Sequence, residues 1–246
     1  MTTDDKSLAE ILRSQPILKP AGSNAADDSC PDCSGSGWIF GEDRARRCDC
    51  LKRKIREDRQ KRFDAEIPPR FRSCSREGWR GNWPLTMPLT WVPTPGKSPW
   101  AVVVWGPPGT GKTHAATALY RELLARFEHL TGMWLSTEEM VSRVKGEFGG
   151  KAVTQRNIEE VDLLMLDDVG RSRESAFTLE LVRSILYRRH LNQMPTIVTC
   201  NAAKLTDFDV IDPALSDRLS IGEGAFHGDF TRKANFRLRK QEGGQG

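Results

Sequence analysis

From Trp100 onward, short apolar runs rich in β-branched residues alternate with longer stretches that carry helical periodicity. The runs that predict strands are Trp100–Trp105, Met133–Leu135, Val161–Leu166 and Thr196–Cys200, with a weaker candidate at Ile221–Phe226. The stretches that predict helices are Thr113–Phe127, Thr137–Val144 and Glu174–Asn192. Because strands that alternate with helices favour a parallel sheet covered on both faces, the pattern predicts an α/β domain.

The chain divides into four parts by composition. Residues 1–29 are polar and residues 241–246 are Gly-rich, so we expect both ends to be flexible. Residues 30–62 carry four Cys followed by many basic residues, which predicts a small separate module that ends in a basic helix. Residues 63–240 make up the α/β domain. We expect the tryptophans of its Pro-rich segment, Gly78–Pro99, to pack on this domain, with nucleic-acid stacking as the less common alternative.

Composition and hydropathy exclude several classes of protein. The 246 residues are 38% hydrophobic and 28% charged, with ten Phe and seven Trp, which excludes a disordered or fibrous chain. The longest uninterrupted apolar stretch, Trp100–Trp105, is far shorter than the roughly 20 residues that cross a bilayer, and Met1–Glu10 lacks the pattern of a signal peptide. We therefore expect a cytoplasmic protein with no membrane partner.

Charge is unevenly distributed along the chain. The overall balance of 37 basic and 33 acidic residues gives a net charge of only +4 and indicates no particular partner. Between Arg44 and Arg62, however, ten Lys or Arg stand against three Asp or Glu, a local net charge of +7. This stretch, which we interpret as helical, either binds an acidic surface or is simply a solvated helical face.

A glycine-rich loop follows the first predicted strand and opens the first predicted helix. It consists of Gly106, Pro107, Pro108, Gly109, Thr110, Gly111, Lys112 and Thr113, which fits G-x-x-x-x-G-K-[ST]. The glycines allow backbone N–H groups to surround phosphates, Lys112 can reach the β- and γ-phosphates of ATP, and Thr113 can ligate Mg²⁺. This context favours a nucleotide site over a glycine-rich turn without a ligand.

Two carboxylates follow the third predicted strand. An apolar run delivers Asp167 and Asp168 to the carboxyl end of the sheet, where ligands bind in open α/β folds. Asp167 is placed to hold Mg²⁺ through water, and Asp168 to orient or deprotonate the water that attacks the γ-phosphate. Asn201 follows the next strand at the same edge and suits γ-phosphate sensing or water positioning, although by itself an Asn here is typical of a turn.

Four cysteines lie close together in the sequence. Cys30 and Cys33 form a Cys-x-x-Cys pair, and Cys48 and Cys50 form a Cys-x-Cys pair after the intervening residues 34–47. This spacing lets two short turns face one another around a tetrahedral ion, for which Zn²⁺ is the expected occupant. A disulfide is disfavoured without a secretion signal, and a redox Cys-x-x-Cys without a surrounding βαβ pattern.

Together the motifs resemble those of the AAA+ ATPases of the DnaC/DnaI helicase-loader and IstB transposition-helper group. The segments that carry the resemblance are Gly106–His114, Leu163–Gly170, Arg189–Asn201 and Ser216–Leu219, with Ile67–Phe71 matching the segment at which the ATPase domain of this group begins. The resemblance implies an AAA+ P-loop NTPase fold with a five-stranded parallel sheet between helices. The zinc-binding module that the cysteine spacing predicts precedes this domain. The resemblance also extends the nucleotide-binding segment to His114.

The resemblance further implies a functional role for seven side chains: Walker A Lys112 and Thr113, Walker B Asp167 and Asp168, sensor 1 Asn201, arginine finger Arg218 and sensor 2 Arg232. An arginine finger acts on the ATP of a neighbouring subunit, so a homo-oligomer is implied in the ATP-bound state. Three features depart from the group. Asp168 stands where Glu is usual, the Pro-rich segment Gly78–Pro99 replaces a more helical one, and few residues remain after Arg232. Slow hydrolysis and little or no C-terminal lid are therefore expected, and the resemblance assigns no adenine contact within Gly78–Pro99.

By this resemblance we expect an ATPase, with ATP, Mg²⁺ and Zn²⁺ as cofactors, that loads a replicative ring helicase onto single-stranded DNA in bacterial or phage replication. The zinc-binding module is expected to bind the helicase, and the ATPase domain the single strand. An IstB-like transposition helper and an ATP-driven protein-remodelling switch that does not bind DNA are the alternatives. The sequence identifies neither the client nor the oligomer size.

Overall fold

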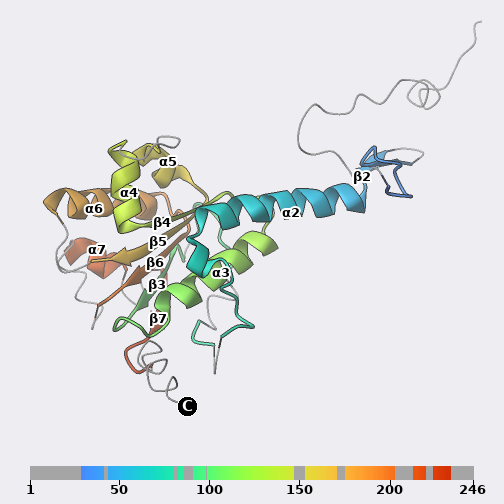
Figure 1. Ribbon diagram of the computed structural model, residues 1–246. Helices are drawn as coiled ribbons and strands as arrows, with labels where there is room; N and C mark the ends of the chain where they lie inside the picture. The colour runs from blue at the N-terminus through green and yellow to red at the C-terminus, as the bar shows by residue number, and fades with distance from the viewer. Residues whose placement is uncertain are drawn as a thin grey trace, which may run out of the picture. The chain divides into compact units, whose positions relative to one another are not determined.

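The computed structural model describes residues 29–41, 44–79, 83–85, 91–97, 99–146, 153–170, 175–202, 213–219 and 224–233. The chain separates into two compact units, Met1–Arg62 and Phe63–Gly246. The first unit carries the paired cysteines and the second carries the glycine-rich loop. Figure 1 colours the chain by residue number from one end to the other. Of the two ends that we expect to be flexible, only Ser29 lies within the described residues.

The first unit contains a short hairpin followed by a helix. Strand β1 (Trp38–Phe40) pairs antiparallel with β2 (Ala45–Arg47). Helix α2 (Asp49–Glu66) begins two residues after β2, and its last four residues belong to the second unit. The helical interpretation is therefore wrong for residues 44–47, because the ladder with β1 fixes residues 45–47 in an extended conformation.

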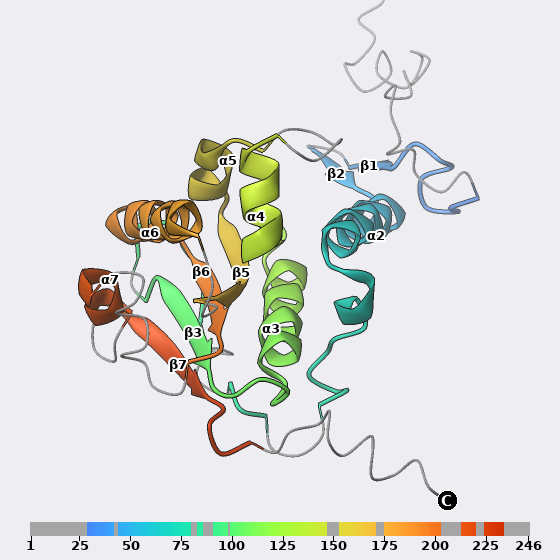
Figure 2. The same cartoon turned by 60° about the vertical axis from the view of Figure 1, so that its left-hand side comes forward.

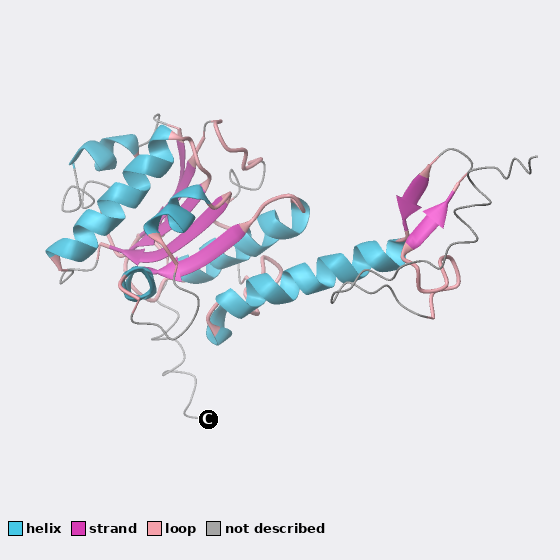
Figure 3. Ribbon diagram, turned by 90° about the horizontal axis from the view of Figure 1, so that it is seen from above, coloured by secondary structure: helices cyan, strands magenta, loops and turns pink. Residues whose placement is uncertain are grey.

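The second unit is built around one sheet of five parallel strands, which confirms the predicted fold class. The strands are β3 (Ala101–Trp105), β4 (Gly132–Ser136), β5 (Leu163–Val169), β6 (Thr196–Cys200) and β7 (Ala225–Asp229). In space they lie in the order β4-β5-β6-β3-β7 (Figure 1), with every neighbouring pair parallel. The strand that precedes the glycine-rich loop thus lies inside the sheet, between β6 and β7. Figure 3 shows the strands of this sheet in magenta.

The last strand is displaced from its predicted position. The apolar pattern favoured Ile221–Phe226, whereas β7 begins at Ala225 and continues to Asp229; residues 221–223 lie outside the described residues. Gly228 lies inside this strand because Leu85 packs against it, and a Cβ on Gly228 would be 2.5 Å from Leu85 Cδ2. A glycine in mid-strand weakens the apolar pattern from which a strand is predicted.

Helices cover both faces of the sheet (Figure 2). Helix α3 (Lys112–Arg126) covers one face, and the other is covered by α4 (Thr137–Val144), α5 (Gln155–Glu160), α6 (Ala176–Leu191) and α7 (Pro213–Arg218). Alternate residues of β3 show the division, since Val103 packs with α6 residues and Val102 with α3 residues. Helices α3, α4 and α6 confirm the predicted ones. Helices α5 and α7 have six residues each, which is too few for a clear helical periodicity in the sequence.

Among the described helices, none has the length and apolar character that crossing a membrane requires.

The segment that precedes β3 packs on the α3 face of the sheet. Ile67, Leu85 and Trp91 are buried there among residues of α3. The indole Nε1 of Trp91 donates a hydrogen bond to the carbonyl oxygen of Pro99 at 2.9 Å, which closes the end of this segment. Trp91 thus packs in the core, as predicted, while residues 80–82, 86–90 and 98 of the segment lie outside the described residues.

A buried arginine on α6 connects three elements on the opposite face. The guanidinium of this fully buried side chain, Arg189, donates hydrogen bonds of 2.6 to 3.0 Å to the hydroxyl of Thr196 and to the carbonyl oxygens of Ile158, Glu159, Val161 and Pro195. These acceptors lie at the end of α5 and the start of β6. One side chain therefore satisfies carbonyl groups that the end of α5 leaves without helical partners.

Candidate functional site

The loop from Gly106 to Gly111 connects β3 to α3, which begins at Lys112. Gly106, Gly109 and Gly111 have φ angles of 142°, 83° and 94°, a region that favours glycine. A side chain at Gly106 would also collide with the chain after β7, because a Cβ there would lie 2.7 Å from the carbonyl carbon of Phe230. The loop ends at the N-terminus of a 15-residue helix, where the helix dipole favours an anion.

The side chain of Lys112 lies within this loop. It is only 5% exposed, and its Nζ donates a hydrogen bond to the carbonyl oxygen of Pro107 at 2.8 Å. Thr110 Oγ1 donates to the same carbonyl oxygen at 2.9 Å. A buried ammonium group that has a neutral carbonyl among its partners can exchange that bond for a stronger, charge-assisted bond to a phosphate oxygen.

Asp167 is the buried carboxylate of the site. It receives hydrogen bonds from the hydroxyls of Thr199 and Thr113. Burial raises the pKa of Asp167 to about 6, with a smaller contribution from Asp168, while the two hydroxyls and the charge of Lys112 act in the opposite direction. At neutral pH Asp167 is therefore ionised beside Thr113, and carboxylate and hydroxyl oxygens are ligands that suit Mg²⁺.

A β-bulge in β5 positions the two carboxylates. Asp167 and Asp168 together lie opposite the single residue Thr199 of β6, between regular pairs on either side. Asp168 has a φ of 63°, a left-handed conformation that is uncommon for residues other than glycine. Its backbone N–H donates to Thr199 Oγ1 at 3.0 Å. One hydroxyl therefore holds both the carboxylate of the first aspartate and the backbone of the second.

The carboxylate of Asp168 meets the candidate sensor. Asn201 Nδ2 donates a hydrogen bond to Asp168 Oδ1 at 2.7 Å. Thr137, the first residue of α4, donates to the backbone carbonyl oxygens of Asp167 and Asp168 at 3.2 and 3.3 Å. Neither Thr137 nor Thr199 was singled out from the sequence. For Thr199 the available signal is a hydroxyl near the carboxyl end of β6, the edge where Asn201 follows.

The two candidate arginines lie away from these contacts. Arg218 is on α7, where its guanidinium carbon lies 5.1 Å from the ring centroid of Tyr187 on α6 and its Nη1 donates to the carbonyl oxygen of Ala214 at 2.9 Å. Arg232 is exposed and lies two residues after Phe230, whose backbone contacts Gly106. Residues 234–246, where a C-terminal lid would follow, lie outside the described residues.

Aromatic side chains lie beside the start of α3. The ring of His114 is 5.6 Å from the ring of Trp79, which is in turn 6.0 Å from the ring of Phe230. His114 Nε2 also lies 3.3 Å from the carbonyl oxygen of Ser75. The segment before β3 therefore contacts the first turn of α3 at His114, a contact that the sequence did not predict.

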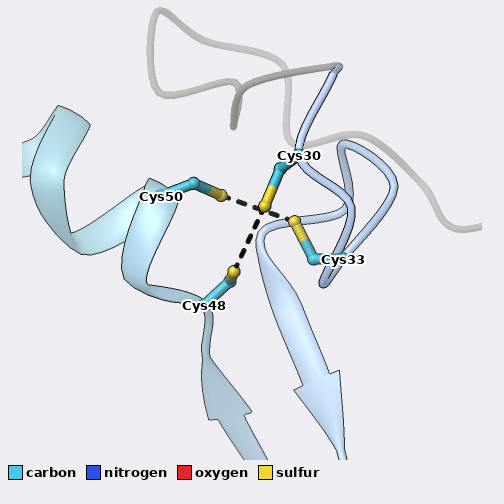
Figure 4. A group of neighbouring side chains, drawn as sticks. All are labelled: Cys30, Cys33, Cys48 and Cys50. Carbon is cyan, nitrogen blue, oxygen red and sulfur yellow. Dashed lines mark hydrogen bonds between the residues drawn. The ribbon is translucent and has the colours of Figure 1, made fainter.

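The four cysteines of the first unit point toward a common centre (Figure 4). Their sulfur atoms all lie within 4.8 Å of one another, with 3.7 Å between Cys30 and Cys48 and 3.4 Å between Cys33 and Cys50. Four thiolates at about 2.3 Å from one zinc ion would lie about 3.8 Å apart, so the donor set fits a tetrahedral metal. The backbone N–H of Gly37 donates to Cys33 Sγ at 3.3 Å, a contact that stabilises a thiolate.

Comparison with known proteins agrees with this geometry. Residues 102–223 match the family described as ATPase family associated with various cellular activities (AAA). The replicative helicase loader DnaC of Escherichia coli strain K12 is 27% identical over 121 residues, which are 48% of this chain and 49% of that protein. The matched region thus spans about half the length of this curated relative.

Two solved structures share the fold. The crystal structure of the DnaC helicase loader has a TM-score of 0.55 and 20% identity, over 66% of this chain and 99% of that chain. The crystal structure of DnaI has a TM-score of 0.53 and 21% identity, over 71% of this chain and 98% of that chain. Together with the strand order and the glycine-rich loop, these similarities confirm an AAA+ P-loop fold and the resemblance inferred from the motifs.

Proposed function

We propose, on the premise that this chain is an AAA+ ATPase resembling the DnaC and DnaI proteins, that it uses ATP to load a replicative ring helicase onto single-stranded DNA. The connection of Thr113 to Asp167 and of Asn201 to Asp168 within one site supports the use of ATP, and the similarity to the DnaC helicase loader supports the loading role. The cysteine module, separate from the ATPase domain, favours a helicase loader over a transposition helper.

In this site the backbone of Gly106–Thr113 would hold the phosphates of ATP, and Lys112 would place its charge against the β- and γ-phosphates. Thr113 and Asp167 would hold Mg²⁺, which neutralises charge on the phosphate oxygens. Asp168 would accept the proton of the attacking water, with its carboxylate oriented by Asn201. Because an aspartate reaches one methylene less far than the usual glutamate, slow hydrolysis fits a protein whose assembly depends on bound ATP.

A second subunit would complete this site. Arg218 contacts Tyr187 and Ala214 in its own chain, and neither residue belongs to the glycine-rich loop or to β5. We therefore assign Arg218 to the ATP of a neighbouring subunit, where its guanidinium would stabilise charge on the transferring phosphoryl group. Arg232, beside the contact between Phe230 and Gly106, would act on the ATP of its own subunit.

The cysteine cluster would hold Zn²⁺ in a structural role. Cys48 follows β2 and Cys50 lies in the first turn of α2, while Cys30 and Cys33 come from the turn before β1. All four side chains are buried and all four would be metal ligands, which leaves no open position for substrate. The ion would therefore fix the hairpin to the start of the helix.

Affinity capture and ATPase assays together test the loader function. Tagged full-length protein, loaded with ATP in extracts of its native cell, should retain the replicative helicase, and Lys112→Ala protein should retain much less. Purified protein should hydrolyse ATP faster when single-stranded DNA is added. Recovery of a transposase in place of the helicase would establish the transposition helper, and unstimulated hydrolysis with neither partner would establish the protein-remodelling switch.

A further inference from the structure

One face of the β1–β2 hairpin exposes two aromatic rings. Trp38 is 39% exposed and Phe40 is 61% exposed, although large apolar side chains are usually buried. Ile39 lies between them in the strand, and it packs against the cysteine cluster on the opposite face. The alternation therefore directs one apolar side chain toward the cluster and two aromatic side chains toward solvent.

A cation lies on the same face as these rings. Trp38 is paired with Arg47, and Phe40 with Ala45, so all four side chains project from one side of the hairpin. Arg47 is exposed, and residues directly opposite one another in an antiparallel pair have Cβ atoms only about 5 Å apart. Ala45 is too small to cover Phe40. The face thus presents two accessible rings and an adjacent guanidinium group.

The second half of the hairpin and the helix after it are strongly basic. Ten Lys or Arg and three Asp or Glu lie between Arg44 and Arg62, so this stretch of the first unit has a local net charge of +7. Accessible rings alone would suit many partners, whereas rings beside a dense run of cations match a strand that alternates bases with phosphates. Trp38 and Phe40 are two residues apart in β1, where the strand rise separates their Cα atoms by about 7 Å, so each ring can stack on a separate base.

We propose that Trp38, Phe40 and Arg47 form a binding platform for single-stranded DNA on the zinc-binding module, with bases stacked on the rings and phosphates near Arg47. The choice of DNA rests on the proposed loader function, but the site differs from the one expected from the sequence, which placed DNA on the ATPase domain alone. The platform would give the loader a DNA contact independent of the nucleotide site.

The test measures binding of full-length protein to a fluorescent oligothymidylate of about 20 nucleotides by anisotropy. The double variant Trp38→Ala/Phe40→Ala should bind at least about tenfold more weakly, because each stacked base contributes a substantial share of the affinity. Arg47→Gln should reduce the dependence of affinity on salt, since one phosphate contact is lost. Phe177→Ala, which removes an exposed aromatic ring of the second unit, is the matched control and should bind as the wild type does.

Each other outcome overturns the proposal in a distinguishable way. Equal binding by wild type and double variant would remove the platform but leave the loader function in place. No binding by the wild type would overturn both the platform and the DNA contact of the loader. Tighter binding of oligouridylate would assign the face to RNA, and loss of helicase binding with unchanged DNA binding would make it a protein interface. If the double variant fails to retain zinc, Phe40→Ala alone decides the outcome, because Phe40 is the more exposed ring.

Discussion

The hydroxyl of Thr199 donates a hydrogen bond to the carboxylate of Asp167, 32 residues earlier in the chain and on the neighbouring strand. The same oxygen accepts a hydrogen bond from the backbone N–H of Asp168. Thr199 therefore holds the bulge in β5 and stabilises the ionised form of the buried carboxylate. In the proposed nucleotide site it would act through the two aspartates, as a positioning residue.

Thr199→Val should raise the pKa of Asp167 above its value of about 6, because a hydrogen bond that stabilises the carboxylate is lost. A bond to a charged group contributes about 1.5 kcal/mol or more, so a rise of about one unit is expected. Carboxyl NMR titration of protein free of metal and nucleotide measures this pKa. Thr131→Val removes a similar bond to Asp162 and should leave the titration of Asp167 unchanged; an unchanged pKa in Thr199→Val would exclude the positioning role.

Lys112→Ala should weaken ATP binding by at least about tenfold, because the ammonium group is the principal side-chain charge available to the β- and γ-phosphates. Asp167→Asn should retain part of the nucleotide affinity and lose Mg²⁺-dependent hydrolysis. Calorimetric titration with ATP measures the affinities. Lys97→Ala, at an exposed position, is the control, and unchanged affinity in folded Lys112→Ala protein would refute the nucleotide-site assignment.

Purified protein should contain one Zn²⁺ per chain, and replacing any of Cys30, Cys33, Cys48 or Cys50 by Ser should release it. A tetrahedral structural site has no spare ligand, so the loss of one thiolate lowers the affinity sharply. Elemental analysis measures the metal, and circular dichroism should show that the ATPase domain remains folded. Cys74→Ala, at a buried cysteine outside the cluster, should keep the ion; protein prepared without chelator that holds no metal would contradict the zinc assignment.

Arg218→Ala should lower ATP hydrolysis by about 10³-fold if its guanidinium acts across a subunit interface. Wild-type activity per chain should rise with protein concentration. Mixing Arg218→Ala with Lys112→Ala protein should restore activity, because hybrid interfaces then combine an intact Lys112 with an intact Arg218. Arg183→Ala, which removes an exposed arginine of α6, is the control. Wild-type activity in Arg218→Ala, independent of concentration, would rule out the finger.

Arg189→Met should lower the free energy of unfolding by about 3 kcal/mol or more, because it leaves several buried carbonyl oxygens and the Thr196 hydroxyl without their donor. Denaturant titration measures the loss. The neighbouring Arg188→Met changes an exposed arginine and should have little effect. Equal stability of the two variants would show that the hydrogen bonds of Arg189 contribute nothing net.

The sequence determined the features that depend on neighbours along the chain. The glycine-rich loop, the Asp167–Asp168 pair and the spacing of the four cysteines are local patterns, and each is interpretable because a short segment must supply the right atoms by itself. The apolar runs of β3 to β6 were evident for a similar reason, since strands buried on both faces are continuously hydrophobic. The short α5 and α7 and the strand β7, interrupted by Gly228, carried weaker local signals.

The tertiary structure alone decided which distant groups meet. Pairing of β5 with β6 brings Thr199 to Asp167, and the bulge there, which places two residues opposite one, lets consecutive carboxylates meet Thr199 and Asn201. Packing of α6 against α5 brings Arg189 to carbonyl groups about 30 residues earlier in the chain. Such bonds join residues far apart in sequence, and no local preference encodes them, because their partners come within reach only when the sheet and its helices have assembled.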